Sequence, residues 1–209
     1  MTNVRKTIIL ASQSKDRKRL FSNARIPHIV IISKYEEKSQ PTLSPKELAL
    51  FHARGKLASA REIVESNKAV LIATEHYVII AADTLVELEG EIIGKAKDRS
   101  HAIQILKKLM GKIHTLITGV VVYDSETNTS AERVDTTQVR FSSLSEQEII
   151  DYVTNSDEYK WRAGSYSMFD RASVFIESVS GSPSNVIGIP MDFIFSQLKK
   201  FNINILEFL

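Results

Sequence analysis

Residues 7–19 read TIILASQSKDRKR, and this stretch decides the class of the fold. The apolar run from Thr7 to Ala11 predicts a buried strand, and a basic helix from about Lys15 to Asn23 follows after a short polar turn. A strand that passes directly into a helix presents free backbone N–H groups at the helix N-terminus, where an anion such as phosphate is favoured. The alternative reading is an ordinary serine N-cap with a solvated basic face.

Strands and helices alternate along the rest of the chain. The segment Ser44-Pro45-Lys46-Glu47 combines a capping box with proline at the first helical position, so it predicts a helix that ends near Ser66. The remaining predicted elements are strands over 28–33, 77–82, 113–123, 133–141 and 172–179, a hairpin over 85–93 about Glu89-Gly90, and helices over 102–110, after Ser145 and after Pro190. The predicted fold class is α/β, with a mixed, twisted β-sheet flanked by helices.

Length and composition favour one folded domain over residues 1–209, because 43% of the 209 residues are hydrophobic and 25% are charged. The formal charge of +2 is too small for bulk attraction to nucleic acid or to a membrane surface. The chain has no cysteine, which excludes disulfides and thiolate metal sites. Since the apolar run Ile8 to Ala11 is too short for a signal peptide or a spanning helix, we expect a cytoplasmic protein.

Acidic residues supply the first candidates for chemistry. Asp83 follows the apolar strand 77–82, where the chain is expected to turn, and a carboxylate at a strand end is a common ligand-binding group. It can equally cap that turn together with Thr84. Glu36 and Glu37 follow the second predicted strand, and two acids brought near Asp83 would hold a hard divalent cation. The alternative is an exposed acidic pair that only aids solubility.

Lysine and histidine residues are less informative. Lys56, within the capped helix, and Lys95, directly after Gly94, can each direct a cation at a polyphosphate, although most lysines have no such role. The five histidines have no metal-ligand spacing, so we expect them to be structural. Neither a GxSxG motif nor a Walker or dinucleotide fingerprint is present.

Taken together in order, these segments resemble the Maf family of nucleoside triphosphate pyrophosphatases over nearly the whole chain. Each motif is weak alone, whereas eight in the right order are specific. They are Leu10-Ala11-Ser12-Gln13-Ser14-Lys15-Asp16-Arg17, Glu36-Glu37, Ala53 to Lys56, Ala82-Asp83-Thr84, Gly94-Lys95, Gly111 to Val120, Ala163 to Tyr166, and Asn185 to Pro190.

The resemblance implies two lobes around a central cleft, as in Maf and ITPase-like folds, and a usual homodimer. It implies cleavage of a nucleoside triphosphate between its α and β phosphates, with Mg²⁺ or Mn²⁺ as the divalent metal. The products are a nucleoside monophosphate and pyrophosphate. Such enzymes are thought to remove unwanted or modified nucleotides, and the family has been linked to septum formation.

The resemblance also assigns roles to residues of this sequence. Asp83 matches the proposed catalytic base, and Glu37 matches an acid that assists the base or the metal, so these two are the expected metal-associated residues. The matched substrate-binding positions are Ser12, Ser14, Arg17, Lys56 and Lys95, and Thr84, Arg162 and Phe169 complete the expected substrate contacts.

Several positions depart from the family pattern. Lys15-Asp16 replaces Pro-Arg, which reverses a charge in the phosphate-binding loop and should weaken anion binding unless Lys15 or Lys18 compensates. Trp161-Arg162 replaces Asp-Lys, and Phe169 replaces a glutamine, so a group that reads a base edge becomes one that can only stack. Phe169 and Trp161 can equally be core or dimer-contact residues.

Two functions from different classes follow. The first is a pyrophosphatase for dTTP, UTP or a modified nucleotide, because Ala-Asp-Thr is typical of the pyrimidine branch of the family. The second is a weak or inactive nucleotide-binding regulator of the same fold, favoured by Asp16 and Phe169. A nucleic-acid-binding role for Lys15 to Arg19 lacks interleaved aromatic residues, so neither nucleic acid nor membrane is an expected partner.

Overall fold

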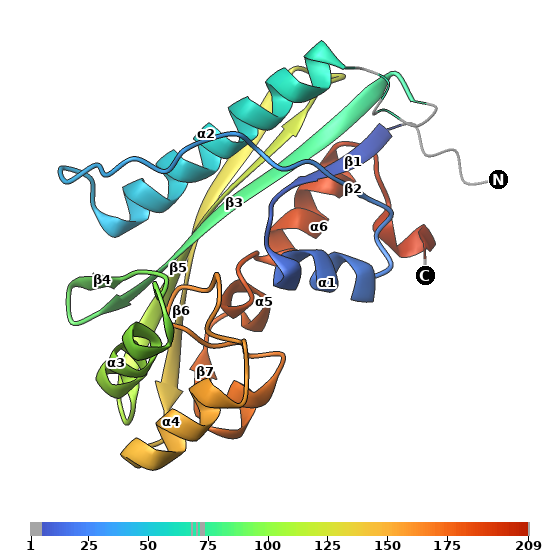
Figure 1. The fold of residues 1–209 in the computed structure, drawn as a ribbon. Coiled ribbons are helices and arrows are strands. Elements are labelled where there is room, and N and C mark those ends of the chain that lie inside the picture. The colour runs from blue at the N-terminus through green and yellow to red at the C-terminus, as the bar shows by residue number, and fades with distance from the viewer. Residues whose placement is uncertain (1–5, 68, 70, 72–73, 209) are drawn as a thin grey trace. The chain divides into compact units, whose positions relative to one another are not determined.

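The computed structural model describes residues 6–67, 69, 71 and 74–208. Along the chain its elements are β1 (Lys6–Ala11), α1 (Lys15–Asn23), β2 (Ile29–Val30), α2 (Pro45–Ser66), β3 (His76–Leu88), β4 (Glu91–Ile93), α3 (Arg99–Leu109), β5 (Ile113–Asp124), β6 (Thr129–Phe141), α4 (Glu146–Thr154), η2 (Arg171–Val174), β7 (Ile176–Ser180), α5 (Pro183–Val186), α6 (Met191–Lys200) and η3 (Ile205–Phe208) (Figure 1).

The strands form one mixed sheet of seven strands in the order β2-β1-β3-β5-β6-β7, and β4 pairs with β3. Strand β1 runs parallel to both β2 and β3, whereas the β3–β4 and β6–β7 pairs are antiparallel. The predicted α/β class with a mixed sheet and flanking helices is therefore confirmed.

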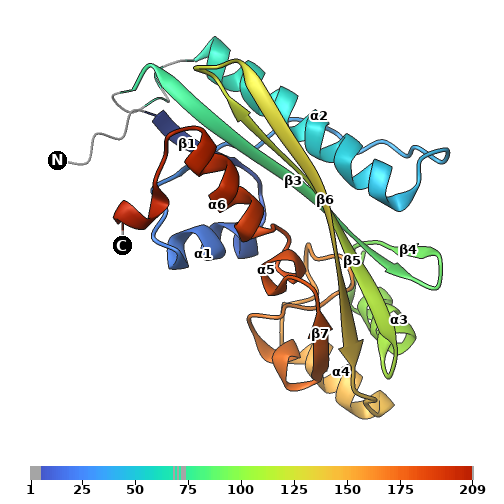
Figure 2. The same ribbon diagram turned by 180° about the vertical axis from the view of Figure 1, so that it is seen from behind.

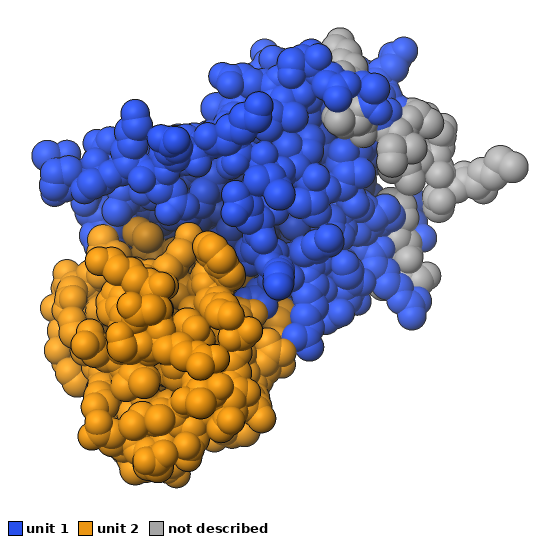
Figure 3. All heavy atoms as spheres, viewed as in Figure 1, with its two compact units in different colours: residues 1–83, 118–135, 188–209 blue, residues 84–117, 136–187 orange. Residues whose placement is uncertain are grey.

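The chain divides into two compact units, each with its own core (Figure 3). Unit 1 comprises residues 1–83, 118–135 and 188–209, and unit 2 comprises residues 84–117 and 136–187. Three long strands, β3, β5 and β6, continue from one unit into the other. The prediction of one domain over 1–209 stays a prediction, as does the central cleft.

In unit 1 the sheet is covered on both faces. Alternate side chains of a strand point to opposite faces, so Leu10 and Ile80 pack with the residues of α1 and α6, while Ile9 and Ile79 pack with the residues of α2. Figures 1 and 2 show α2 on one face and α1 with α6 on the other. Because both faces are buried, the apolar residues Ile8 to Ala11 of β1 and Tyr77 to Ala82 of β3 form continuous runs rather than alternating with polar ones.

Unit 2 has a separate apolar core. Helix α3 contributes Ala102, Ile105, Leu106 and Leu109, as the helical spacing of these residues predicts. They belong to one buried cluster with Val86 of β3 and with residues of α4, which opens on the predicted capping box at Ser145.

Three predicted elements differ from the structure. The strand predicted over 28–33 is only Ile29–Val30, because only these two residues pair with β1, opposite Ile9 and Leu10. The predicted turn after Asp83 does not occur, since β3 continues to Leu88 and pairs there with β4. The strand predicted over 172–179 runs instead from Ile176 to Ser180, because residues 171–174 form the 3₁₀-helix η2, where the buried carboxylate of Glu158 accepts the N–H groups of residues 171 and 172.

Candidate active site

In unit 1 the ammonium group of Lys56 lies between two carboxylates. Lys56 Nζ lies 2.5 Å from Asp83 Oδ1 and 2.7 Å from Glu37 Oε1. Exposure rises along this series, since the side chains of Asp83, Lys56 and Glu37 are 7%, 15% and 40% exposed. The three residues, called here the Glu37–Lys56–Asp83 cluster, therefore run from the core to the surface.

Strand β3 places the Asp83 side chain on the face of the sheet that packs against helix α2. Ile79 and Ala81 face the α2 side of the sheet, and Asp83 follows them two residues on, so the pleat places its side chain on the same face. Helix α2 buries small residues such as Ala53 toward the sheet, which allows a close approach. Lys56 lies less than one turn beyond Ala53 and reaches the carboxylate.

An aromatic contact holds the loop that carries Glu37. A Cβ atom at Gly55 would lie 2.5 Å from Cζ of Tyr35, so only glycine allows this ring to sit against α2. The Tyr35 hydroxyl is 3.0 Å from Nδ1 of His52, also on α2. Burial raises the pKa of Tyr35, and the charges of Glu37 and Asp83 add to that rise. No motif in the sequence indicates this role of Tyr35, although a glycine inside a capped helix is a signal for a close approach.

Arg17 connects the start of α1 to the strand that carries Asp83. Its side chain is buried, with Nε donating to the carbonyl of Gly188 at 2.7 Å and Nη1 donating to the carbonyl of Ala82 at 2.8 Å. Burial lowers the pKa of Arg17, and the negative charges of Asp83, Glu37 and Asp16 oppose this shift. The guanidinium therefore fixes the peptide group next to Asp83 in addition to bringing positive charge into the cluster.

The serines of the first loop organise the turn between β1 and α1. Ser14 is the N-cap of α1, and its hydroxyl accepts the N–H of Arg17 at 3.3 Å. Its own N–H donates to the hydroxyl of Ser12 at 3.1 Å. The ordinary N-cap that the sequence left open is thus present at Ser14, and a phosphate-binding role for either serine stays a prediction.

The carboxylates of this cluster fit a divalent metal ion whose remaining ligands would come from water and substrate. Asp83 Oδ2 is buried and accepts no hydrogen bond from any residue that the structure describes. Within those same residues no group of three or more His, Asp or Glu side chains could hold a metal ion. Mg²⁺ is commonly bound through one or two carboxylates together with water and substrate phosphates. Asp83 and Glu37 match that pattern rather than an all-protein cage.

Four predicted substrate contacts belong to unit 2. Thr84 follows Asp83 on β3 and is half-buried, and Lys95 is exposed, with its backbone paired to that of Ala163. Arg162 donates from Nη1 to the carbonyl of Glu158 at 2.7 Å, and Phe169 is half-buried. Their roles toward a substrate stay predictions.

One histidine of unit 2 is deeply buried. His114 Nε2 lies 2.9 Å from the hydroxyl of Tyr166, and burial lowers the pKa of His114 to about 4. The ring also packs edge-on against Phe141 at a centroid distance of 4.6 Å. A neutral imidazole in an aromatic core agrees with the structural role that we expected for the histidines.

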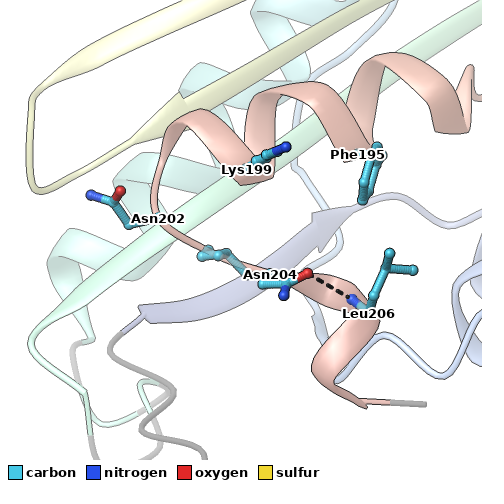
Figure 4. A pocket seen from close by; sticks show the side chains of 6 residues that line it. Phe195, Lys199, Asn202, Asn204 and Leu206 are labelled. Carbon is cyan, nitrogen blue, oxygen red and sulfur yellow. Dashed lines mark hydrogen bonds between the residues drawn. The ribbon is translucent and has the colours of Figure 1, made fainter.

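A pocket of about 460 Å³ lies at the end of α6 in unit 1 (Figure 4). Its lining offers one cation and two amides beside three apolar side chains, from Phe195, Lys199, Asn202, Ile203, Asn204 and Leu206. Because these residues include no carboxylate, the pocket lacks the groups that metal-assisted hydrolysis uses.

Comparison with known proteins identifies relatives over nearly the full length. Residues 7–201 match the family model described as Maf-like protein. The chain is 34% identical over 201 residues to a dTTP/UTP pyrophosphatase of Bacillus cereus (strain G9842), with 96% of this chain and 98% of the relative covered. It is also 34% identical over 203 residues to a protein of the same name from Pelotomaculum thermopropionicum, covering 96% and 100%. None of the helices described here is long and apolar enough to span a bilayer.

Proposed function

The chain belongs to the Maf-like protein family, and on that premise we propose that it is a metal-dependent nucleoside triphosphate pyrophosphatase. The names of its relatives support dTTP or UTP as the substrate. The observation that carries the proposal is the Glu37–Lys56–Asp83 cluster, in which a buried carboxylate has one oxygen on a lysine and the other without a hydrogen bond from the described residues. Such a carboxylate is available to accept a proton or to bind a metal.

In the proposed reaction a water oxygen attacks the α-phosphorus, and the bond from this phosphorus to the α–β bridging oxygen breaks. The products are a nucleoside monophosphate and pyrophosphate. Asp83 accepts the proton of the attacking water at Oδ2, and Lys56 orients the carboxylate through its contact with Oδ1. Glu37 assists at the exposed end of the cluster.

In the alternative role for this carboxylate, Asp83 binds the metal together with Glu37 rather than taking the proton, and Mg²⁺ or Mn²⁺ held there would neutralise charge on the triphosphate. Ser12, Ser14 and Arg17 would contribute phosphate contacts at the N-terminus of α1, where the helix dipole favours an anion. On unit 2, Lys95, Thr84 and Arg162 would bind the phosphate chain, and Phe169 would contact the base.

A second candidate function is a nucleotide-binding regulator with little or no turnover. Asp16 supports it, because this carboxylate lies in the first turn of α1, next to the loop that would bind phosphate. A negative charge there opposes binding of a triphosphate tail.

The test measures pyrophosphate release from a panel of canonical and modified nucleoside triphosphates with Mg²⁺, with Mn²⁺ and with a chelator. The wild-type protein is expected to hydrolyse dTTP or UTP only with metal. Asp83→Asn should lose at least about 100-fold in kcat, the usual contribution of a general base. Asp151→Asn, on the exposed side of α4, is the matched control and should keep full activity. Full activity of Asp83→Asn would overturn the assignment, and nucleotide binding without turnover across the panel would favour the regulator.

We further propose, from the family resemblance, a cytoplasmic homodimer that removes unwanted nucleotides and is linked to septum formation. We propose that it binds neither nucleic acid nor membrane. Light scattering on the purified protein tests whether it is a dimer, and a filter-binding assay with DNA tests whether it binds nucleic acid.

A further inference from the structure

A loop of unit 2, residues 155–175, is built around one buried carboxylate. Glu158 is 9% exposed and accepts hydrogen bonds from the Tyr152 hydroxyl at 2.8 Å and from the N–H of Arg171 at 3.0 Å. The carbonyl of Glu158 in turn accepts Nη1 of Arg162 at 2.7 Å. These bonds tie both halves of the loop to the same residue, so the loop has a defined shape.

Trp161 lies next to this anchored arginine, and its indole side chain projects into solvent. It is 83% exposed, and its backbone has a φ of +69°. The left-handed region is unfavourable for a bulky residue, and an exposed indole gains nothing from burial. Backbone strain that the surrounding structure maintains is a feature of ligand-binding sites. Neither packing nor backbone preference therefore accounts for tryptophan at this position.

The same loop is joined to the segment that carries Lys95. Ala163, two residues after Trp161, forms an antiparallel bridge with Lys95. The family resemblance gives Lys95 a phosphate-binding role, whereas the family pattern has an aspartate at the position of Trp161. The loop that carries the Trp161 ring is thus joined, through one backbone bridge, to the segment that is expected to bind the phosphate chain.

We propose that Trp161 is a specificity-determining residue that stacks on the nucleobase of the bound nucleoside triphosphate. The proposal rests on the function proposed above and adds a contact for the base. Stacking on an aromatic ring accepts every base, because each base has a π-face. The protein should therefore discriminate less sharply among bases than a site that reads a base edge by hydrogen bonds.

The chain contains a single tryptophan, so its fluorescence reports on this position alone. The probes are dTTP in the presence of a chelator and a non-hydrolysable dTTP analogue with metal, and inorganic tripolyphosphate is the control without a base. Both nucleotides should quench the emission, whereas tripolyphosphate should bind, as measured by calorimetry, without quenching it.

Kinetics supply the second readout. Trp161→Ala should raise KM for dTTP by about 5-fold to 100-fold, the loss expected for one stacked base, with kcat nearly unchanged. Trp161→Phe should recover most of the affinity. Val174→Ala removes another apolar side chain of unit 2, one that is 86% exposed, and should leave KM unchanged.

Nucleotide binding without any change in emission, or a wild-type KM in Trp161→Ala, would overturn the stacking proposal. In either case dTTP hydrolysis by the wild-type protein would leave the proposed function standing. A wild-type protein that neither binds nor hydrolyses any nucleotide would overturn both.

Discussion

Replacing Gly119 by alanine should push helix α2 away from the sheet. Gly119 lies on β5, and a Cβ atom built there would sit 2.5 Å from the carbonyl oxygen of Ala49 on α2. Real Cβ atoms essentially never approach other atoms within 3.0 Å, so the helix must withdraw by roughly 1–1.5 Å to restore van der Waals contact. The obstacle is main chain, which cannot rotate aside as a side chain can.

The expected cost is about 1–3 kcal/mol of stability, the usual penalty for overpacking. For a chain of this size that corresponds to a fall in Tm of about 2–12 °C. Because α2 also carries Lys56, its shift would lengthen the 2.5 Å contact with Asp83. A displacement of this size near reacting groups costs about 100-fold in kcat/KM.

Differential scanning calorimetry and the pyrophosphate assay measure the two effects. Gly94→Ala is the matched control for stability, because a Cβ atom there meets no atom within 4 Å and its backbone does not require glycine. It should change stability by less than about 0.5 kcal/mol. A Tm for Gly119→Ala that equals the Tm of Gly94→Ala would refute the close approach of α2 to β5.

Three further predictions concern buried charged or titratable groups. Arg17→Lys should lower Tm and should lower kcat/KM by about 10-fold to 100-fold, because a lysine lacks the planar guanidinium that donates to two main-chain carbonyls at once. Calorimetry and the pyrophosphate assay measure the two effects. Arg19→Lys, on the exposed face of α1, is the control and should change neither. His114 has a folded-state pKa of about 4, below its unfolded value, so the stability it contributes is present above about pH 6.5 and is lost as the pH falls toward 4. This loss amounts to about 3 kcal/mol, and urea unfolding across that range should show it in the wild type and not in His114→Gln. Lys6→Met should cost about 3–5 kcal/mol in urea unfolding, because it leaves the fully buried Asp124 without its cation, and a wild-type midpoint would contradict this.

Much of the fold could be predicted from local sequence. Helices α1 and α2 begin and end where their caps and periodicity predict, since an N-cap serine and a proline at the first helical position act within one turn. The hairpin of β3 and β4 turns at Glu89-Gly90 as expected, because these two residues adopt positive φ. These features depend on residues close together in the chain.

The strand that carries Asp83 shows where local reasoning failed. We expected Asp83 to end its strand, because an acid after an apolar run resembles a turn residue. The strand continues through it, because residues 86–88 find partners in β4. Strand ends are set by the availability of a neighbouring strand, and that is a property of the whole sheet.

The sequence by itself determined the α/β class, the capped helices and the presence of Asp83, Glu37 and Lys56 as chemically capable residues. Only the tertiary structure decided that these three meet, because Lys56 and Asp83 are 27 positions apart and become neighbours through the pleat of β3 and the close packing of α2. It also decided that Tyr35 packs on Gly55 and that Trp161 faces solvent. Periodicity and caps act within a few residues, whereas contacts between charges on separate elements depend on how those elements pack.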